Sequence, residues 1–508
     1  MTTFTTLAQM VALQDPNAVA LTQPAGVPIN YGQLKQLIAD TVMQLNALGL
    51  GRGDRVGIVL PNCPEMATCF VAIASACTAA PLNMAYRADE FEFYLSDIKA
   101  KALVVAKGSE TPAREIASKL NIPIIELIAT PQLGAGLYTL EGKAQAQTTG
   151  QSGYAQPDDI ALILHTSGTT SRPKIVPLTQ RNVCASARNI AATLALSPSD
   201  IELHIMPLFH IHGLIAGVLA PWAAGSSIFC TPGFNALKFF GWMKEAKPTW
   251  YTAVPTMHQT ILSRAAGNVD VIAANPLRFI RSSSSSMPPQ VIAQVEEVFK
   301  TPLIESYGMT EAAHQMASNP LPPAKRIPGS VGIAAGPEIA IMDNDGNLLA
   351  AGEIGEIVIR GENVTLGYEN NPKANAEGFT HGWFRTGDQG QLTPDGYLSL
   401  TGRLKEIINR GGEKISPREV DEVLMDHPAV AQVVTFGIPH EKLGEEVGAV
   451  IVLKAEQTAT ERDIRDFAAK RLADFKVPRK ILFMDEIPRG ATGKLQRIGL
   501  SAKLGLGS

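Results

Sequence analysis

A ten-residue segment rich in small hydroxyl side chains, His165 to Lys174 (HTSGTTSRPK), is the part of the sequence best suited to chemistry. Serine, threonine and glycine leave backbone N–H groups accessible, and Lys174 adds a positive charge. A polyphosphate needs many donors and tolerates little side-chain bulk, so the segment predicts a phosphate-binding loop. A flexible linker is the weaker alternative, because a strand is expected before the segment and a helix after it. The GxxxxGK[ST] pattern does not fit, which excludes a P-loop ATPase.

Alternating helices and strands are expected to position this loop. The pattern predicts an amphipathic helix over residues 31–48, a buried strand over 56–60 and a second helix over 64–77. Residues 160–164, the loop and a helix over 179–196 form a strand–loop–helix unit, which is typical of anion sites. Further units of this kind are expected at residues 205–224 and 250–263, and a helix over 290–299 followed by a strand over 303–307 is expected after them. The N-terminal part is therefore predicted to be an α/β domain of several subdomains, with mixed sheets flanked by helices.

The pattern changes after about residue 330. Short strands at 339–342, 355–360 and 396–400 are punctuated by Gly and Asp and predict a β-rich subdomain. Ser416 is expected to cap a helix, with Pro417 in its first turn and Glu419 completing a capping box. Strands at 433–438, 447–453 and 481–484 and a helix at 460–475 would complete a small α+β unit. We expect an N-terminal domain of residues 1–403 and a C-terminal domain of residues 404–508.

Composition and charge exclude several classes of protein. The 508 residues are 45% hydrophobic and 18% charged, with a net charge of -4, which favours a globular enzyme and gives no basic surface for nucleic acid. Five cysteines without CxxC spacing indicate neither a zinc site nor a disulfide framework. No signal peptide, no terminal SKL-type address and no apolar run long enough to span a membrane are recognised. These features predict a cytoplasmic protein.

Five separate motifs resemble those of the adenylate-forming acyl-CoA synthetase superfamily. They are the loop above, Tyr307–Glu311 (YGMTE), Thr386–Asp388 (TGD), Gly402–Glu406 (GRLKE) and Gly493–Lys494. They follow the order of that family and cover the chain from about residue 30 to 500. Within the superfamily the chain is most similar to the oxalate–CoA ligase branch of plants and fungi, through the segments LHTSGTTSRPK, MPLFHIHGL, WYTAVPTMHQ, SNPLPP and NRGGEKISP.

The resemblance implies a two-step reaction. A carboxylate attacks the α-phosphate of ATP to give an acyl-adenylate and pyrophosphate, and the thiol of the co-substrate coenzyme A then displaces AMP. Mg²⁺ is the expected metal, held by Thr166 and Glu311, because cations must offset the repulsion between the attacking anion and the phosphate. These two residues and Lys494 are the expected catalytic residues. The residues expected at the nucleotide are Thr166, Ser167, Gly168, Thr169, Thr170, Lys174, Ser306, Tyr307, Thr310, Glu311, Asp388, Arg403 and Lys494.

The resemblance also gives individual roles to these residues. Lys494 would contact the acyl carboxylate and the α-phosphate, Asp388 the two ribose hydroxyls, and Arg403 the ribose and phosphate. Tyr307 would stack on adenine. Lys405 would be the hinge about which a mobile C-terminal domain rotates between the two steps.

That rotation would bring a glycine loop to coenzyme A. Gly411, Gly412 and Lys414 are its expected contacts, since paired glycines suit a close approach of backbone to the pantetheine arm. A turn before the following helix explains the same glycines, and both interpretations can hold. Ile175 stands where relatives carry a small residue, and the direction of its effect on turnover does not follow from the sequence.

The acid is expected to be short and polar. His212, Ser284, Ser285 and His314 match positions that line the acyl pocket in relatives. A fatty acid gains about 0.8 kcal/mol per buried CH₂, whereas unsatisfied Ser and His groups cost about 1–3 kcal/mol each. A dicarboxylate such as oxalate uses those donors. A zinc site at His204, His210 and His212 is disfavoured because no further ligand completes the set.

Three alternatives stay open. The first keeps the chemistry with malonate or another short or medium-chain acid. The second is a stand-alone adenylation module that loads a carrier, against which we weigh the lack of a carrier domain after residue 500. The third is a protein that binds a nucleotide without turnover. It is the weakest alternative, because the chain retains Lys494, Glu311 and Asp388 together.

Overall fold

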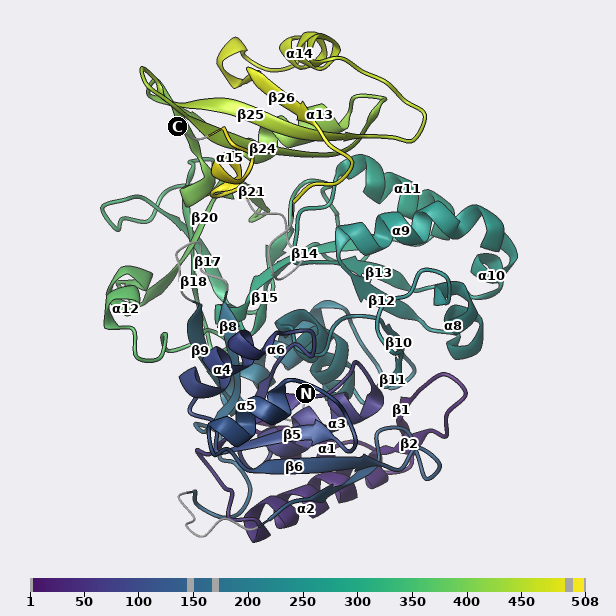
Figure 1. Cartoon of the computed structure of the whole chain (residues 1–508). Coiled ribbons are helices and arrows are strands. Elements are labelled where there is room, and N and C mark those ends of the chain that lie inside the picture. Colours follow the sequence, from purple (N-terminus) through teal and green to yellow (C-terminus); the bar gives the residue numbers. More distant parts are fainter. Residues whose placement is uncertain (1–2, 144–149, 167–172, 489–496, 507–508) are drawn as a thin grey trace. The chain divides into compact units, whose positions relative to one another are not determined.

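The computed structural model describes residues 3–143, 150–166, 173–488 and 497–506 (Figure 1). The chain forms two compact units. The first contains residues up to 166, 174–339 and 359–382, and the second contains 340–358 and 383 onward. The domain boundary expected after residue 403 was placed at a predicted hinge, and it stays a prediction.

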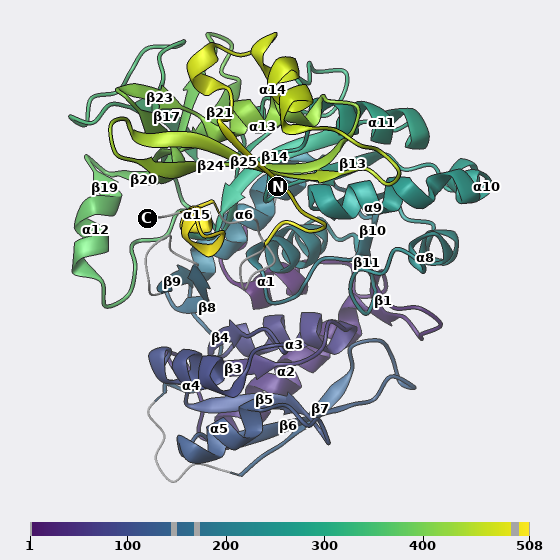
Figure 2. The ribbon, with the colours of Figure 1, turned by 45° about the horizontal axis from the view of Figure 1, so that its top comes forward.

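A seven-stranded sheet carries the predicted phosphate loop at its edge. Its order is β7 (Tyr138–Glu141), β6 (Ile124–Ala129), β5 (Ala102–Ala106), β3 (Arg55–Val59), β4 (Thr78–Pro81), β8 (Ile160–Thr166) and β9 (Lys174–Thr179). The central strands are parallel and the two edge strands are antiparallel to their neighbours. The helices of this region are α2 (Tyr31–Ala47), α3 (Pro64–Ala74), α4 (Ala88–Asp97) and α5 (Ala113–Lys119). Helices α4 and α5 pack together on one face of the sheet, where Phe91 and Leu95 meet Leu103 and Val105 (Figure 2).

A nine-stranded sheet forms the other half of the first unit. Its order is β16 (Ile333–Ala334), β15 (His314–Ser318), β14 (Leu303–Met309), β13 (Phe279–Ser282), β12 (Trp250–Ala253), β10 (Ile201–His204), β11 (Ser227–Cys230), β1 (Val19–Thr22) and β2 (Ile29–Asn30). Strands β10 to β14 run parallel, and the antiparallel strand β15 follows β14 through a tight turn, η3 (Thr310–Ala312). Parallel strands buried on both faces explain the apolar runs of the sequence.

Helices connect these strands. They include α1 (Leu7–Ala12), α6 (Gln180–Thr193), α7 (Ala220–Ala223), α8 (Phe239–Ala246), α9 (Pro255–Ala265), α10 (Val269–Ala274), α11 (Pro289–Phe299) and α12 (Pro372–Gly378). Helix α6 begins at Thr179, whose hydroxyl accepts from the N–H of Asn182 at 3.1 Å in a capping box. Residues His212–Leu219 form a π-helix, η1, a geometry that frequently marks functional sites.

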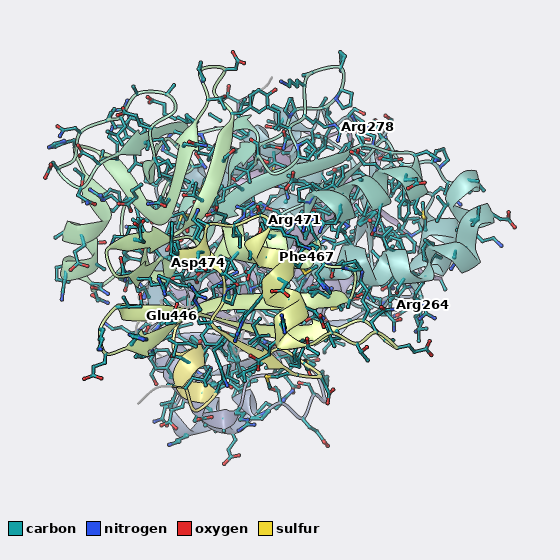
Figure 3. The ribbon with its side chains drawn as sticks, turned by 90° about the horizontal axis from the view of Figure 1, so that it is seen from above. Arg264, Arg278, Glu446, Phe467, Arg471 and Asp474 are labelled. Carbon is teal, nitrogen blue, oxygen red and sulfur yellow. The ribbon has the colours of Figure 1, made fainter. Side chains whose placement is uncertain are left out.

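The second unit is rich in strands. One sheet has the order β23 (Glu413–Ile415), β22 (Ile408–Arg410), β25 (Gly444–Leu453) and β24 (Val430–His440), with β26 (Lys480–Phe483) beside β25. Its helices are α13 (Pro417–Met425), α14 (Glu461–Ala469) and α15 (Leu500–Lys503). The remaining strands of the chain are β17 (Glu338–Met342), β18 (Gly355–Arg360), β19 (Phe379–Thr380), β20 (Trp383–Leu392) and β21 (Leu398–Arg403), followed by the turn η4 (Leu404–Glu406). After α14, the Arg471 guanidinium lies 3.8 Å from the centroid of the Phe467 ring (Figure 3).

The predicted fold class is confirmed, with three local corrections. Residues 174–179, expected only as the exit of a loop, form strand β9. The helix expected over 460–475 ends at Ala469. Ser416 caps α13 as predicted, accepting from the N–H of Glu419. The expected capping box is wrong, because the Glu419 carboxylate accepts from the Lys476 ammonium instead of from the Ser416 N–H. Among the described residues, no helix is long and apolar enough to cross a membrane.

Candidate active site

Strands β8 and β9 hold the two ends of the predicted phosphate loop. Thr166, the last residue of β8, pairs in register with Lys174, the first residue of β9. The preceding residue, His165, places Nε2 3.0 Å from Oδ2 of Asp97 on α4, and burial lowers the pKa of its imidazole. His165 therefore joins the beginning of the loop to α4. The predicted nucleotide contacts Ser167, Gly168, Thr169 and Thr170 lie outside the described residues.

A tyrosine that the sequence did not single out links two of the expected site residues. The Tyr368 hydroxyl donates to Oε1 of Glu311 at 2.8 Å. The Lys174 ammonium lies 4.3 Å from the centroid of the Tyr368 ring, within the range of a cation–π contact. Burial and the Glu311 charge raise the pKa of Tyr368, so its hydroxyl stays protonated and able to donate. Tyr368 thus fixes the Glu311 carboxylate beside a cation at the exit of the loop.

The segment that carries this tyrosine is bonded to both parts of the site. The N–H of Thr365 donates to the carbonyl of Glu311 at 2.7 Å, and the Thr365 hydroxyl donates to the carbonyl of Pro177 in β9. The N–H of Glu369 donates to the carbonyl of Ile175, also in β9. Ile175 is buried in the core, where its branched side chain packs. Residues 365–369 therefore tie the Glu311 turn to the strand that leaves the phosphate loop.

A tight connection between β14 and β15 presents Glu311. The residue sits in the turn η3 and its side chain is 5% exposed. A Cβ on Gly308 would lie 1.7 Å from the carbonyl oxygen of His314, so only glycine permits this close pairing of the two strands. The glycine in the YGMTE motif is therefore explained by backbone packing, and it places Thr310, Glu311 and His314 together.

Ser306 and Tyr307 lie earlier on β14. The Ser306 hydroxyl donates to the carbonyl of Ser282 on the neighbouring strand β13 at 3.3 Å. Tyr307 is 8% exposed and pairs in register with Ala317 of β15. Both residues are held by the sheet within the sequence stretch that leads to Glu311.

Three of the four residues expected at the acid lie in one polar cluster. His212 places Nδ1 3.0 Å from the Ser284 hydroxyl and Nε2 2.7 Å from that of Thr252. The His212 and His314 rings stack with centroids 4.8 Å apart. Ser284 has a φ of 72°, a conformation that serine rarely adopts. Ser285 is exposed and is not part of this cluster.

A buried arginine, also missed in the sequence, lies behind this cluster. Arg281 on β13 is 0% exposed. One terminal nitrogen lies 3.3 Å from His212 Nε2 and 3.3 Å from Thr252 Oγ1, and the other lies 3.2 Å from His314 Nε2 and 3.2 Å from Gln315 Oε1. Arg281 is thus the residue that bridges the two histidines.

Asp388 and Arg403 belong to the second unit and are paired there. They face each other across β20 and β21, with Arg403 Nε 3.0 Å from Asp388 Oδ1. Thr386 accepts from the N–H of Asp388, and Gly387, with a φ of 74°, donates its N–H to Glu356 at 2.8 Å. The TGD motif therefore forms an ordered turn that fixes a 3%-exposed carboxylate beside a half-exposed guanidinium.

The expected coenzyme A loop is the tight connection between β22 and β23. Gly411 and Gly412 both have positive φ, at 59° and 97°, as a two-residue hairpin turn requires. Lys414 is exposed and its ammonium contacts the side chain of Asn409. Lys405, the expected hinge, is exposed in η4. Lys494 lies outside the described residues.

Metal-binding clusters of His, Cys, Asp and Glu are not found in the described ranges. His204 is fully buried beside Glu202, with Nδ1 3.3 Å from Oε2. Hard oxygen donors such as the Glu311 carboxylate and the Thr166 hydroxyl nevertheless suit Mg²⁺, which keeps several of its waters or phosphate ligands.

Tyr368 and Arg281 share a reason for being missed. Neither stands in a motif with recognisable spacing, and Tyr368 lies 57 residues from Glu311 in the sequence. Arg281 interrupts an apolar strand, and an isolated arginine in a short strand gives no indication that both faces of that strand are buried.

The mixed sheets flanked by helices, the Glu311 carboxylate held by Tyr368 and the buried polar cluster around His212 belong to an α/β protein whose family the comparisons with known proteins identify. Residues 8–369 match the model of the AMP-binding enzyme family, and residues 419–494 match the AMP-binding enzyme C-terminal domain. The chain belongs to this family and is an acid–CoA ligase that works through an acyl-adenylate.

Named relatives and solved structures agree with that membership. The chain is 46% identical to an oxalate–CoA ligase of Arabidopsis thaliana, over 97% of each chain. It is 43% identical to an oxalate–CoA ligase of Saccharomyces cerevisiae, over 88% of this chain and 86% of the yeast protein. Its structure resembles the o-succinylbenzoate–CoA synthetase MenE of Bacillus subtilis, solved with ATP and a magnesium ion. The TM-score is 0.82 at 28% identity, over 97% of this chain and 98% of that one.

Proposed function

We propose that the protein is an oxalate–CoA ligase, which converts oxalate, ATP and coenzyme A into oxalyl-CoA, AMP and pyrophosphate. The observation that carries this proposal is the buried polar cluster of His212, Ser284, His314 and Arg281. The names of the plant and yeast relatives support it. A cytoplasmic location stays a prediction.

The polar cluster favours a second carboxylate over an aliphatic chain. A hydrocarbon against Ser284 and the two histidines would leave hydrogen-bonding groups unsatisfied at about 1–3 kcal/mol each. Each CH₂ buried in exchange returns only about 0.8 kcal/mol. A short dicarboxylate accepts hydrogen bonds from the same groups and keeps its other carboxylate for attack on the α-phosphate.

Residues of the two units would serve the nucleotide. We assign the phosphates to Lys174 and the described end of the loop, adenine to Tyr307, and the ribose hydroxyls to Asp388 with Arg403 beside it. Thr166 and Glu311 would hold Mg²⁺, which offsets the charge of the phosphates when bound. The Tyr368 hydrogen bond supports this assignment because it orients the Glu311 carboxylate without neutralising it.

The remaining roles concern the second step. Gly411, Gly412 and Lys414 would line the approach of coenzyme A. Lys405 would be the hinge about which the C-terminal domain rotates, so that this loop takes the place of Lys494 in the second step. The exposed two-glycine turn supports the first of these assignments, because neither glycine carries a Cβ that would obstruct an approach to the backbone.

The deciding experiment is a pyrophosphate-release panel with oxalate, malonate, acetate and octanoate, each with and without coenzyme A. We expect oxalate to give the highest kcat/KM and the product to have the mass of oxalyl-CoA. A preference for malonate would redefine the acid and keep the polar pocket. A preference for octanoate would contradict both the choice of oxalate and the role of the polar cluster in binding the acid.

Lys494→Ala tests the mechanism within the same assay. We expect adenylation to slow by roughly 10²- to 10³-fold, the usual cost of one lost contact to developing charge. Thioester formation from preformed acyl-adenylate should be spared, and Lys35→Ala, an exposed lysine of α2, serves as the matched control. Equal loss of both steps would remove the role given to Lys494.

A further inference from the structure

Arg281 is a positive charge enclosed by the protein. Its side chain is 0% exposed, and burial lowers its pKa to about 9, which leaves it charged at neutral pH. A buried ion costs several kcal/mol unless it is paired. Within the described part of the chain, no Asp or Glu forms an ion pair with Arg281, and its partners are imidazole, hydroxyl and amide groups.

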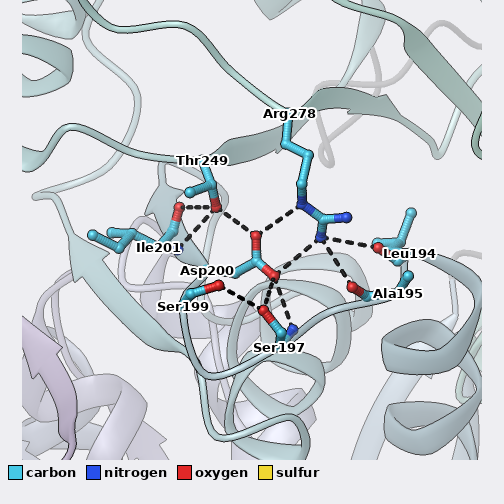
Figure 4. A network of polar contacts seen from close by, with 8 residues as sticks. All are labelled: Leu194, Ala195, Ser197, Ser199, Asp200, Ile201, Thr249 and Arg278. Atoms are coloured by element: carbon cyan, nitrogen blue, oxygen red, sulfur yellow. Dashed lines mark hydrogen bonds and ion pairs between the residues drawn. The ribbon is translucent and has the colours of Figure 1, made fainter.

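A second arginine three residues earlier shows how the protein satisfies such a charge elsewhere. Arg278 places Nε 3.0 Å from Oδ1 of Asp200 and Nη2 3.1 Å from Oδ2, and it also donates to the carbonyl of Leu194 (Figure 4). Asp200 is held in turn by the Thr249 hydroxyl. Arg281 differs from Arg278 in that the partners found for it among the described residues are neutral, so its charge makes the surrounding cluster favourable for an anion.

The contacts of Arg281 determine which ring nitrogens carry protons. A guanidinium only donates hydrogen bonds, so the Nε2 atoms of His212 and His314, at 3.3 and 3.2 Å, must accept. Both imidazoles are then neutral, with their protons on Nδ1. Burial, together with the charges of His314 and Arg281, holds the pKa of His212 well below its usual value, in agreement with a neutral ring.

The other titratable groups around His212 do not supply an anion close to its ring. They are His204 on β10 and His258 on α9, in addition to Arg281 and His314. Both act on His212 in the same direction as Arg281, because each lowers the pKa of its imidazole.

The proton on His212 Nδ1 directs the hydrogen bonds toward Ser284. His212 Nδ1–H donates to the Ser284 hydroxyl at 3.0 Å, which leaves the proton of that hydroxyl to donate further. Thr252 accepts from Arg281 and donates to His212 Nε2 at 2.7 Å, in the same direction. A chain of donors therefore runs from the buried cation to a half-buried serine, and such chains strengthen each of their bonds.

We propose that Arg281 is the positioning residue for acid specificity: it holds His212 and His314 as neutral Nδ1–H tautomers and supplies the charge that favours a second carboxylate at Ser284. This inference rests on the proposed function, since the anion it invokes is the distal carboxylate of a dicarboxylic acid. Arg281 acts through His212 and Ser284 and does not itself contact the acid.

The tautomers are measured directly in the protein without acid. In protein labelled with ¹⁵N at its nine histidines, two-bond ¹H–¹⁵N correlation spectra should show His212 and His314 as neutral Nδ1–H rings, assigned with His212→Asn and His314→Asn. In Arg281→Met these rings should change tautomer or become mixed, whereas Arg278→Met should leave them unchanged. A protonated ring or an Nε2–H tautomer in the wild-type protein would overturn the proposal, and this result does not depend on any variant folding.

Steady-state kinetics distinguish the loss of the Arg281 charge from a general structural effect of the substitution. Arg281→Met should raise the KM for oxalate on the order of 10- to 100-fold, the usual effect of losing a hydrogen-bond network to a charge, and change the KM for acetate much less. Acidification toward about pH 5.5 should partly restore oxalate binding in this variant, because the histidines can then take up the lost charge. Arg281→Lys should keep part of the preference for oxalate.

Three outcomes would overturn the proposal. One is an equal rise in KM for oxalate and acetate, one is an Arg281→Met variant with wild-type selectivity, and one is a loss of selectivity in Arg278→Met as well. If the wild-type enzyme does not use oxalate or another dicarboxylate, the proposed function fails, while the tautomer spectra still decide whether Arg281 sets the histidine protons.

Discussion

Single side chains determine the electrostatics on each side of the proposed reaction centre. Tyr368 bonds Glu311 and lies against Lys174, so it keeps a carboxylate and a cation close together. We propose a corresponding role for Arg281 behind the polar cluster. In both places a neutral side chain contacts the charged residue.

Tyr368→Phe tests the first of these arrangements at the residue scale. Removing the hydroxyl leaves Glu311 without its 2.8 Å donor. We expect a Mg²⁺ requirement raised on the order of 10-fold, since a hydrogen bond to a charged group contributes about 1.5–3 kcal/mol. Pyrophosphate release measured against Mg²⁺ concentration reports this change. Tyr154→Phe, at an exposed tyrosine, is the control, and an identical Mg²⁺ dependence in the two variants would count against the role of Tyr368.

At the scale of elements, the connection of β14 to β15 brings a residue proposed for the nucleotide close to one proposed for the acid. It places Glu311 in the turn and His314 at the start of β15, three residues apart. Its tightness depends on Gly308, because the strands approach more closely there than any side chain allows.

Gly308→Ala should therefore be strongly destabilising. A Cβ placed 1.7 Å from a backbone oxygen forces the strands apart, and we expect the free energy of unfolding to fall by about 3 kcal/mol or more. Gly241→Ala is the matched control, because no atom lies within 4 Å of its added Cβ in helix α8. Gly241→Ala should raise the free energy of unfolding by up to about 0.5–1 kcal/mol, because alanine favours a helix more than glycine does. Urea unfolding followed by tryptophan fluorescence measures both, and equal midpoints would contradict the packing argument.

At the scale of the whole molecule, the core of the first unit encloses two histidines, His212 and His258, whose pKa is lowered by burial. His258 is fully buried, with Nδ1 3.2 Å from the Tyr251 hydroxyl, and burial lowers its pKa to about 4. Burial also lowers the pKa of His212. In the unfolded chain these histidines have an ordinary pKa of about 6.5. Below that pH the unfolded chain therefore binds protons at histidines that stay unprotonated in the native state.

Stability should consequently fall as the pH falls from about 6.5 toward 4, at up to about 1.4 kcal/mol per pH unit for each such histidine. His258→Gln should reduce this slope by about one proton, whereas His381→Gln, at an exposed histidine, should not. Urea midpoints between about pH 7 and 5 give the slopes. A His258→Gln slope equal to that of the wild-type protein would contradict the assignment.

The local elements of the fold followed from sequence patterns wherever the pattern was long or capped. Helices α2 and α11 and the cap of α13 lie where periodicity and capping residues predicted them. Strand β9 was missed because Pro177 interrupts it. Proline is tolerated there since β9 is the edge strand of its sheet, a position that local sequence does not reveal.

The amino-acid sequence by itself determined the class of chemistry: a loop of small residues after a strand, the order of five motifs, and a polar set of His212, Ser284 and His314. Such features are short segments of sequence, so their resemblance to a known family exposes them. The tertiary structure alone decided how Tyr368 meets Glu311 and how Arg281 lies enclosed between two histidines. Those contacts depend on strands that pair far along the chain, and burial, which gives an unpaired charge its effect, exists only once the sheets have packed.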